Sequence, residues 1–198
     1  MSLLPFRKVR SGIDHRRSAF VFEDRFWEDA DTMQPYVRAV LASASTAVES
    51  SDVMESDSTR FLSQPIHDLL PGELLQRLLV RIREWGKGCL GTRGATTPTI
   101  KIYGSGCGRE LSVGGVPAAW HYILCCANGS GRDSFLFRLL QESSQSDVGG
   151  LHICLDHLTT FKLSFNQLLV ISPGVAYDVS RSNTSSTSIS LFIEGYLL

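Results

Sequence analysis

The sequence lacks the features that mark membrane, nucleic-acid-binding and zinc proteins. No uncharged apolar run reaches the roughly 18 residues that a membrane-spanning helix needs, and the formal net charge is only −1. Charge therefore gives no reason to expect nucleic acid or an anionic membrane as a partner. The opening MSLLPFRKVR has too short an apolar run before its charges to be a signal peptide. No CxxC pair is present, which argues against a structural zinc site.

The cysteines indicate free thiols rather than a disulfide framework. There are five of them, at Cys89, Cys107, Cys125, Cys126 and Cys154. The number is odd, and the adjacent pair would point to opposite faces of a strand, where the two thiols cannot easily bond. We therefore expect a reducing, cytoplasmic environment.

Length and composition predict one domain with a normal core. The chain has 198 residues, of which 43% are hydrophobic and 20% charged. Residues 1–18 are basic and irregular, and we expect them to form an N-terminal arm. The remainder, 19–198, is predicted to be a single domain with helices over about 30–88 and a barrel over about 97–198. A polar segment at 50–60 is predicted to be a flexible loop.

Helical spacing dominates the first half of the chain. Residues 18–24 predict a short strand, and 31–50 a helix. A second helix is predicted over 71–88, because one stripe gathers Leu74, Leu75, Leu78, Leu79, Ile82 and Trp85. This stripe is typical of a core face. Gly86 and Gly88 are expected to end the helix.

From residue 97 the hydrophobic period changes to two. Strands are predicted at 97–106, 118–126, 133–140, 149–158, 161–165, 167–172, 176–182 and 188–198. Turn signals separate them at Gly104–Gly108, Asn128–Gly131, Gly149–Gly150, Asn166 and Pro173–Gly174. Because these strands follow the helices rather than alternating with them, we expect an α+β fold. It would be an antiparallel barrel or jelly roll with the N-terminal helices packed on one sheet.

The order of these segments resembles a known superfamily. IKIYGSG, WHYIL, GGLHI, QLLVISPGVAYDV and SISLFIEGYLL follow two helices, over about residues 65–198. This succession resembles the Fe(II)/2-oxoglutarate-dependent dioxygenases. The resemblance implies that the barrel is an antiparallel double-stranded β-helix, which is a cupin-like jelly roll.

The resemblance also implies that the metal triad is degenerate. In that family one strand carries a His-x-Asp or His-x-Glu pair, a later strand carries a second His, and an Arg some ten residues further on binds the cosubstrate carboxylate. His121 matches the first His, but Ile123 stands at the acid position. Tyr177 stands at the second His position and Thr187 at the Arg position. A relocated site built from His121, His152 and Tyr177 is an alternative.

A pocket without its metal remains a plausible reaction site. If the family register holds, His121 and Tyr177 still point into the mouth between the sheets. A neutral His can accept a proton near pH 7, and a Tyr can donate one or stabilise an oxyanion. We therefore predict His121 and Tyr177 as catalytic residues. The simpler alternative is a hydrogen-bonded core histidine beside a tyrosine that only fills the barrel.

Four further residues are predicted to bind a substrate. Tyr103 is expected close to the mouth, and Arg138 is expected to reach inward. Arg181 shares strand parity with the tyrosine at 177, and Cys125 shares parity with the histidine at 121. As an alternative, Arg181 is a solvated charge at a strand end.

Three functions of different classes follow. The first is a metal-independent biosynthetic enzyme that needs no cofactor and cyclises, isomerises or eliminates a small molecule. The second is an Fe(II)/2-oxoglutarate oxygenase with unusual ligands. The third is a non-catalytic binding or scaffold protein, which would show a filled pocket. The expected partner is a small-molecule substrate, with no nucleic acid or membrane, and the sheet edges would allow a homodimer.

Overall fold

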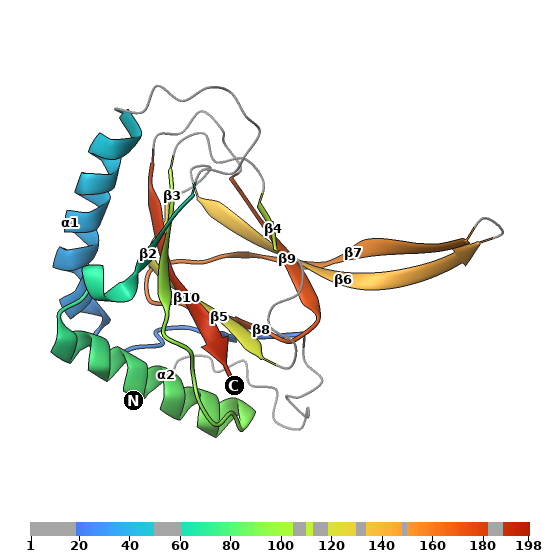
Figure 1. Cartoon of the computed structure of the whole chain (residues 1–198), viewed down its shortest axis with the longest axis horizontal. Coiled ribbons are helices and arrows are strands. Elements are labelled where there is room, and N and C mark those ends of the chain that lie inside the picture. The colour runs from blue at the N-terminus through green and yellow to red at the C-terminus, as the bar shows by residue number, and fades with distance from the viewer. Residues whose placement is uncertain are drawn as a thin grey trace, which may run out of the picture.

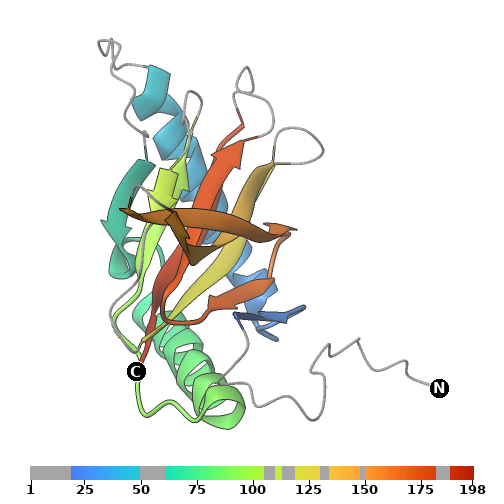
Figure 2. The ribbon, with the colours of Figure 1, turned by 90° about the vertical axis from the view of Figure 1, so that its right-hand side faces the viewer.

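Two antiparallel sheets and two helices are stacked in three layers (Figure 1). The computed structural model describes residues 19–49, 61–104, 110–112, 119–129, 134–147, 150–181 and 188–198. The helices are α1 (Ala30–Glu49) and α2 (Gly72–Leu90), with a 3₁₀ turn, η2 (Ile66–Asp68), before α2. In Figure 2 the smaller sheet faces the viewer, α1 lies behind the larger sheet and α2 runs below it.

The larger sheet combines strands from both halves of the chain. Its order is β1 (Phe20–Glu23), β8 (Leu168–Ile171), β5 (Trp120–Ala127), β10 (Ser190–Leu197), β3 (Thr99–Tyr103) and β2 (Phe61–Pro65). The smaller sheet has the order β4 (Glu110–Ser112), β9 (Val175–Arg181), β6 (Phe135–Asp147) and β7 (Gly150–Lys162). All the recorded strand pairs are antiparallel. The predicted α+β fold with helices on one sheet is confirmed.

Strand alternation divides the interior into two apolar cores. The core between the helices and the larger sheet includes Ile100, Ile102, Tyr122, Leu124, Leu191 and Ile193. The core between the two sheets includes Tyr103, Ile123, Cys125, Phe135, Phe137 and Phe192. Neighbouring residues of β5 thus belong to different cores, because successive side chains of a strand point to opposite faces. Burial of each large apolar side chain stabilises the fold by roughly 1.5–3 kcal/mol.

The predicted end of the second helix is wrong. Helix α2 runs through Gly86 and Gly88 to Leu90, and Gly91 caps it in the left-handed conformation, with φ +70°. Gly86 has a packing role instead. A Cβ atom there would lie 2.6 Å from Thr92 Oγ1 and 2.9 Å from a methyl carbon of Leu197, so only glycine allows this approach of α2 to β10.

The predicted separation of 149–158 from 161–165 is also wrong. Strand β7 is continuous and pairs with β6 in one long hairpin that projects beyond the body of the molecule (Figure 1). The register shifts where Leu139 pairs with Thr159 and Leu140 with His157, which leaves Leu158 as an extra residue in β7. A bulge therefore lies where the hydrophobic pattern suggested a break.

The first 112 residues contribute more strands to the sheets than their sequence pattern indicates. The strand expected at 18–24 is present as β1, but β2 and β4 were not predicted from the sequence. Both are short, and β2 lies directly before the 3₁₀ turn. The predicted arm at 1–18 and loop at 50–60 lie outside the described residues, as do Cys107 and Thr187.

Candidate functional site

Three adjacent strands of the larger sheet bring polar side chains to one end of the space between the sheets. On β10, Tyr196 pairs directly with His121 of β5, and Glu194 pairs with Thr99 of β3. Strand alternation places these residues, together with Lys101, on the face that carries Ile123 and Phe192 of the inter-sheet core. Register alone therefore gathers a histidine, a carboxylate and an ammonium group at one place.

The carboxylate of Glu194 joins the two basic groups. Its Oε2 atom lies 3.3 Å from His121 Nε2 and 3.2 Å from Lys101 Nζ. Glu194 is 3% exposed and His121 8% exposed, so this cluster is largely removed from water. Buried charges persist in a folded protein only when they are paired in this way.

The surroundings of Glu194 favour its ionised form. Burial by itself raises the pKa of this carboxyl, but the hydrogen bond and charge of His121 outweigh it, together with the charge of Lys101. The net result is a pKa below the usual value for glutamate. The other oxygen, Oε1, is buried and accepts no hydrogen bond from any described residue. Only one of the two carboxylate oxygens of Glu194 therefore has polar partners among the described residues.

Two tyrosines flank the imidazole ring. The ring centroid of His121 lies 5.0 Å from that of Tyr196, nearly stacked, and 5.2 Å from that of Tyr177 on β9 of the smaller sheet. Together they border a cavity of about 170 Å³. Its lining consists of Thr96, Thr97, Thr99, Lys101, His121, Tyr177, Glu194, Gly195 and Tyr196. We call this space the mouth cavity.

Of the six residues predicted for the site, His121 and Tyr177 line the mouth cavity together. Tyr103 and Cys125 share the same inner face but lie further along their strands. Tyr103 packs against Phe135, with ring centroids 5.0 Å apart, and is 1% exposed. Burial raises the pKa of the Cys125 thiol, which lies 3.7 Å from the carbonyl oxygen of Leu163. Neither residue lines the mouth cavity, so the expected position of Tyr103 close to the mouth is wrong.

The expected inward position of Arg138 is also wrong. Its neighbours Phe137 and Leu139 face the inter-sheet core, so Arg138 lies on the outer face of the smaller sheet. There its Nη2 atom is 3.3 Å from Asp178 Oδ2 and 3.2 Å from Ser180 Oγ. Arg181 is the last residue of β9, and only its backbone position, opposite Phe135, is described.

Sequence reasoning missed three residues of the cluster: Lys101, Glu194 and Tyr196. A signal for the two charged residues was present in the pattern. Glu194 shares its face of β10 with Phe192 in SLFIEGY, and Lys101 shares its face of β3 with Tyr103, and both of these aromatic residues belong to the inter-sheet core. An isolated charge at a core-facing position needs a partner. That reasoning would have suggested pairing Lys101 with Glu194, although the strand order was needed to bring them together.

The side chains around His121 do not fit the iron site of the resembled family. Ile123, at the acid position, is fully buried in the inter-sheet core and has no donor atom. Glu194 already carries the Lys101 ammonium on the oxygen that faces His121, so a divalent cation would meet a like charge there. The described residues contain no group of three or more His, Cys, Asp or Glu side chains that could hold a metal ion.

The alternative ligand set with His152 is contradicted by the hairpin. His152 pairs with Gln145 on β6, whereas Tyr177 pairs with Leu139. Six residues along a strand correspond to about 20 Å. His152 therefore lies about that far along the hairpin from the strand position of Tyr177, which lines the mouth cavity.

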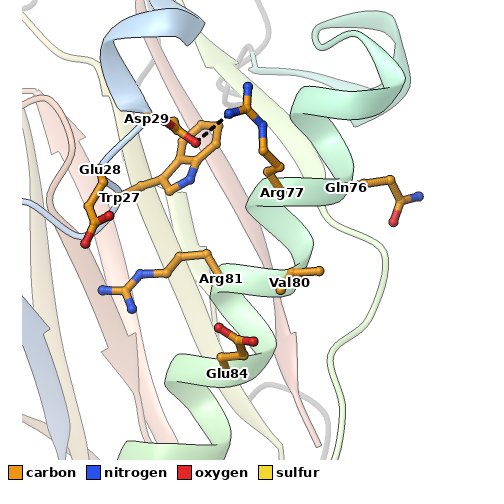
Figure 3. Close-up of a pocket in the computed structure, with 8 residues that line it drawn as sticks. All are labelled: Trp27, Glu28, Asp29, Gln76, Arg77, Val80, Arg81 and Glu84. Atoms are coloured by element: carbon orange, nitrogen blue, oxygen red, sulfur yellow. Dashed lines mark hydrogen bonds and ion pairs between the residues drawn. The ribbon is translucent and has the colours of Figure 1, made fainter.

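A second, larger groove lies on the outer side of α2 (Figure 3). It has a volume of about 450 Å³ and is lined by Trp27, Glu28, Asp29, Gln76, Arg77, Val80, Arg81 and Glu84. Its arginines have partners already, because Arg77 Nη1 lies 2.9 Å from Asp29 Oδ2 and Arg81 Nε donates to the carbonyl oxygen of Phe26. It offers neither a histidine nor a tyrosine, and we regard the mouth cavity as the better candidate for chemistry.

Comparisons with known proteins agree with this fold. No protein-family model matches the chain, and no curated protein matches its sequence. Among solved structures, a prolyl-4-hydroxylase from Pseudomonas putida is similar over 93% of this chain and 94% of its own, with a TM-score of 0.60 and 15% identity.

Two enzymes of nogalamycin biosynthesis are also similar. The non-heme α-ketoglutarate-dependent carbocyclase SnoK has a TM-score of 0.56 at 13% identity, over 92% of this chain and 81% of its own. The epimerase SnoN has a TM-score of 0.56 at 10% identity, over 93% and 79%. Identities this low establish the fold alone. The chain therefore has the double-stranded β-helix fold of the Fe(II)/2-oxoglutarate dioxygenases, with a histidine–glutamate–lysine cluster at its mouth.

Two further observations bear on the environment of the protein. No helix of the described residues is long and apolar enough to cross a membrane. Cys89, Cys125 and Cys126 are free thiols.

Proposed function

We propose that the protein is a metal-independent enzyme that uses acid/base chemistry on a small molecule in the mouth cavity. One observation carries this proposal. The buried His121 has its Nε2 atom 3.3 Å from the carboxylate of Glu194, and it lines a cavity beside two tyrosines. A carboxylate that fixes one imidazole nitrogen is a recurring device for orienting a general base. Many isomerisations, cyclisations and eliminations use such a base and need no oxidant.

Each member of the cluster has a role in this proposal. With Nε2 held by Glu194, the Nδ1 atom of His121 is the nitrogen left to exchange a proton with a substrate. The hydroxyl groups of Tyr177 and Tyr196, which line the same cavity, would donate to an oxygen that gains negative charge. Lys101 compensates the charge of Glu194 and so keeps this carboxylate ionised inside the fold.

The structural neighbours support the choice of reaction class. A carbocyclase and an epimerase from a biosynthetic pathway share this fold with hydroxylases. Those enzymes are described as α-ketoglutarate-dependent, whereas the cluster in this chain does not fit a metal. We propose that this chain rearranges a small molecule by proton transfer alone, on a fold that it shares with those enzymes. A small-molecule substrate, a cytoplasmic location and pairing through sheet edges remain predictions.

Proton exchange with solvent is the most general test, because it does not require the substrate to be known in advance. The protein would be treated with EDTA and incubated in D₂O with a panel of small carbonyl compounds, and deuterium incorporation next to the carbonyl would be followed by NMR. His121→Gln is expected to abolish enzyme-dependent exchange, and Tyr177→Phe to reduce it about 10²-fold or more.

Tyr122→Phe is the matched control for these variants. Tyr122 is the neighbour of His121 on β5 but faces the helices, and its hydroxyl has no hydrogen-bond partner among the described residues. Its rate is expected to equal that of the wild type. Exchange that persists unchanged in His121→Gln would refute the proposed role of the histidine.

A non-catalytic binding protein is the second candidate, and the size of the cavity favours it. About 170 Å³ lies below the usual range of roughly 300–1,000 Å³ for ligand pockets. Beyond the mouth, the aromatic rings of Tyr103, Phe135, Phe137 and Phe192 fill the space between the sheets. Binding of a compound without exchange or turnover across the panel would favour this candidate.

A further inference from the structure

We propose that two copies of this chain pair through the outer edge of β7, antiparallel and centred on Cys154, so that the two smaller sheets join into one continuous sheet. The inference goes beyond the proposed function, and its test does not depend on that function. It assigns an interaction surface to the projecting part of the β6–β7 hairpin (Figure 1).

The first support is that this part of the hairpin has only two strands. Strand β9 pairs with β6 as far as Gln141, and beyond it residues 142–147 of β6 pair with 150–155 of β7. We call these two segments the ribbon. Among the described residues no third strand joins the ribbon, and β7 lies at the edge of the smaller sheet. Two strands alone are marginally stable in water. Pairing of two copies along β7 makes a ribbon of four strands.

The second support is the uneven distribution of apolar residues over the two ribbon strands. On one face, β7 carries Leu151, Ile153 and Leu155 at alternate positions. The positions paired with them on β6 are a serine, a serine and a glutamate. The apolar row therefore belongs to the edge strand alone. Antiparallel pairing of two copies of β7 brings two such rows side by side, whereas pairing along β6 would not.

The third support is that the sequence of β7 is complementary to itself. Pairing about a two-fold axis at Cys154 places His152 opposite Asp156 of the second copy, and Ile153 opposite Leu155 of the second copy, each twice. An imidazole N–H can donate to a carboxylate in either protonation state of the ring. Polar and apolar pairs of this kind, directly across two strands, stabilise a sheet. Moving the axis by one residue in either direction leaves Asp156 opposite a glycine or a cysteine. The complementarity favours a second copy over an unrelated peptide and selects one register.

The bulge in β7 limits the length of this pairing. The regular part of the strand runs from Gly150 to the extra residue Leu158, and Cys154 is the midpoint of that stretch. Beyond the bulge, the ring of Phe161 packs against Phe20 of β1, with centroids 4.8 Å apart, so this end of β7 belongs to the body of the molecule. The stretch of regular edge therefore coincides with the stretch that the two-fold register uses.

Sedimentation equilibrium tests the association directly. Samples from roughly 1 to 100 µM are expected to show a mass that rises with concentration toward twice the 21.8 kDa of the chain. His152→Asp puts two pairs of aspartates opposite each other and is expected to raise the dissociation constant about tenfold or more. Adding Asp156→Lys restores opposite charges across the axis and should recover most of this loss. His67→Asp, the same change at an exposed residue of the 3₁₀ turn, is the control and should leave the dissociation constant unchanged.

A disulfide tests the register. Directly opposed residues of antiparallel strands have Cα atoms about 4.5–5.5 Å apart, which a disulfide can span. Diamide accepts the two electrons and two protons that a pair of thiols gives up. It is expected to convert the wild-type dimer into a covalent dimer in which peptide mass spectrometry finds Cys154 bonded to Cys154. Cys154→Ser should abolish this product.

The outcomes decide the proposal separately from the proposed function. A wild-type protein that is monomeric at every concentration would overturn the pairing, and so would a dimer that His152→Asp leaves intact. A disulfide from Cys154 to a different cysteine would overturn the register. The wild-type measurements decide the proposal even where a variant does not fold. None of these results bears on proton exchange by His121, so a failure of the pairing is distinguishable from a failure of the enzyme.

Discussion

The two ends of the space between the sheets are built from the same strands but differ completely in chemistry. At the closed end, Cys125 of β5 and Phe192 of β10 lie in an apolar cluster with Phe137. At the mouth, His121 and Glu194, on those same two strands, form a buried polar pair. Strand alternation sets the face of each side chain. Position along the strand decides whether that side chain meets an aromatic core or a cavity.

The difference between the two ends explains why a residue predicted for the site can lie on the correct face of its strand and still be away from the cavity. Period-two alternation correctly assigned Cys125 to the same face of β5 as His121, because Cys125 and Ile123 both lie in the inter-sheet core. It carries no information about how far along the strand the cavity extends. The closed end is a packing unit and the mouth is a chemical unit, so substitutions at the two ends should have different effects.

The largest effect is expected from a large-to-small substitution at the closed end. Phe192→Ala removes a fully buried ring that packs against Phe137 and Tyr103. It should lower the free energy of unfolding by about 3–5 kcal/mol, measured by urea denaturation. Tyr196→Phe, at the mouth on the same strand, is the control and should cost less than about 1 kcal/mol. Equal losses would show that the mouth is packed as tightly as the closed end.

The next effect is electrostatic and belongs to the mouth. Lys101→Met leaves the buried carboxylate of Glu194 without its ammonium partner. Removing one member of a buried ion pair should cost about 3 kcal/mol in the same denaturation experiment. Adding Glu194→Gln to this variant should restore most of the loss, because the unpaired charge then disappears. A single variant as stable as the wild type would contradict the view that Lys101 compensates Glu194.

A smaller effect is expected on the pH dependence of stability. The pKa of Glu194 is lower in the folded protein than in the unfolded chain, where it is about 4.3. Ionised Glu194 therefore stabilises the fold above that value, and the contribution is lost as the pH falls through the folded-state pKa. The difference in unfolding free energy between wild type and Glu194→Gln should be constant from about pH 5 to 6 and should change below about pH 4, to the disadvantage of the wild type. A difference that is independent of pH from 3 to 6 would contradict this coupling.

The smallest effect is the reactivity of the closed-end thiol. Burial raises the pKa of Cys125 and so leaves little thiolate at pH 8. Iodoacetamide should therefore modify Cys125 slowly in the native protein and rapidly in urea, as measured by peptide mass spectrometry. The partly exposed Cys89 should react faster in the native state. Rapid native labelling of Cys125 would mean that the closed end opens to solvent.

Much of the fold could be predicted from the sequence, because periodicity reports directly on helices and strands. The two helices, most of the later strands and the helix-on-sheet arrangement follow from it. Two local errors arose because a bulge at Leu158 imitated a strand break and because Gly86 serves close packing rather than helix termination. Strand β4 has only three residues, and β2, with the sequence FLSQP, does not alternate apolar and polar residues, so neither strand produces a period-two signal.

The candidate site could be predicted only in part. Alignment with the motif order of the resembled family located His121 and Tyr177. It could not locate Lys101 or Glu194, because no motif marks them and their meeting depends on β3 and β10 being neighbours. The outward position of Arg138 follows from the parity of FLFRLL once Phe137 and Leu139 are known to be buried.

The central claim is that a cluster of His121, Glu194 and Lys101 takes the place of a metal centre in this fold. The most direct measurement is to purify the protein anaerobically, offer it Fe(II) and 2-oxoglutarate, and measure the retained iron and the heat of 2-oxoglutarate binding. We predict that no stoichiometric iron is retained and that no binding heat is detected. One iron per chain, with 2-oxoglutarate binding that is lost in His121→Ala, would contradict the account.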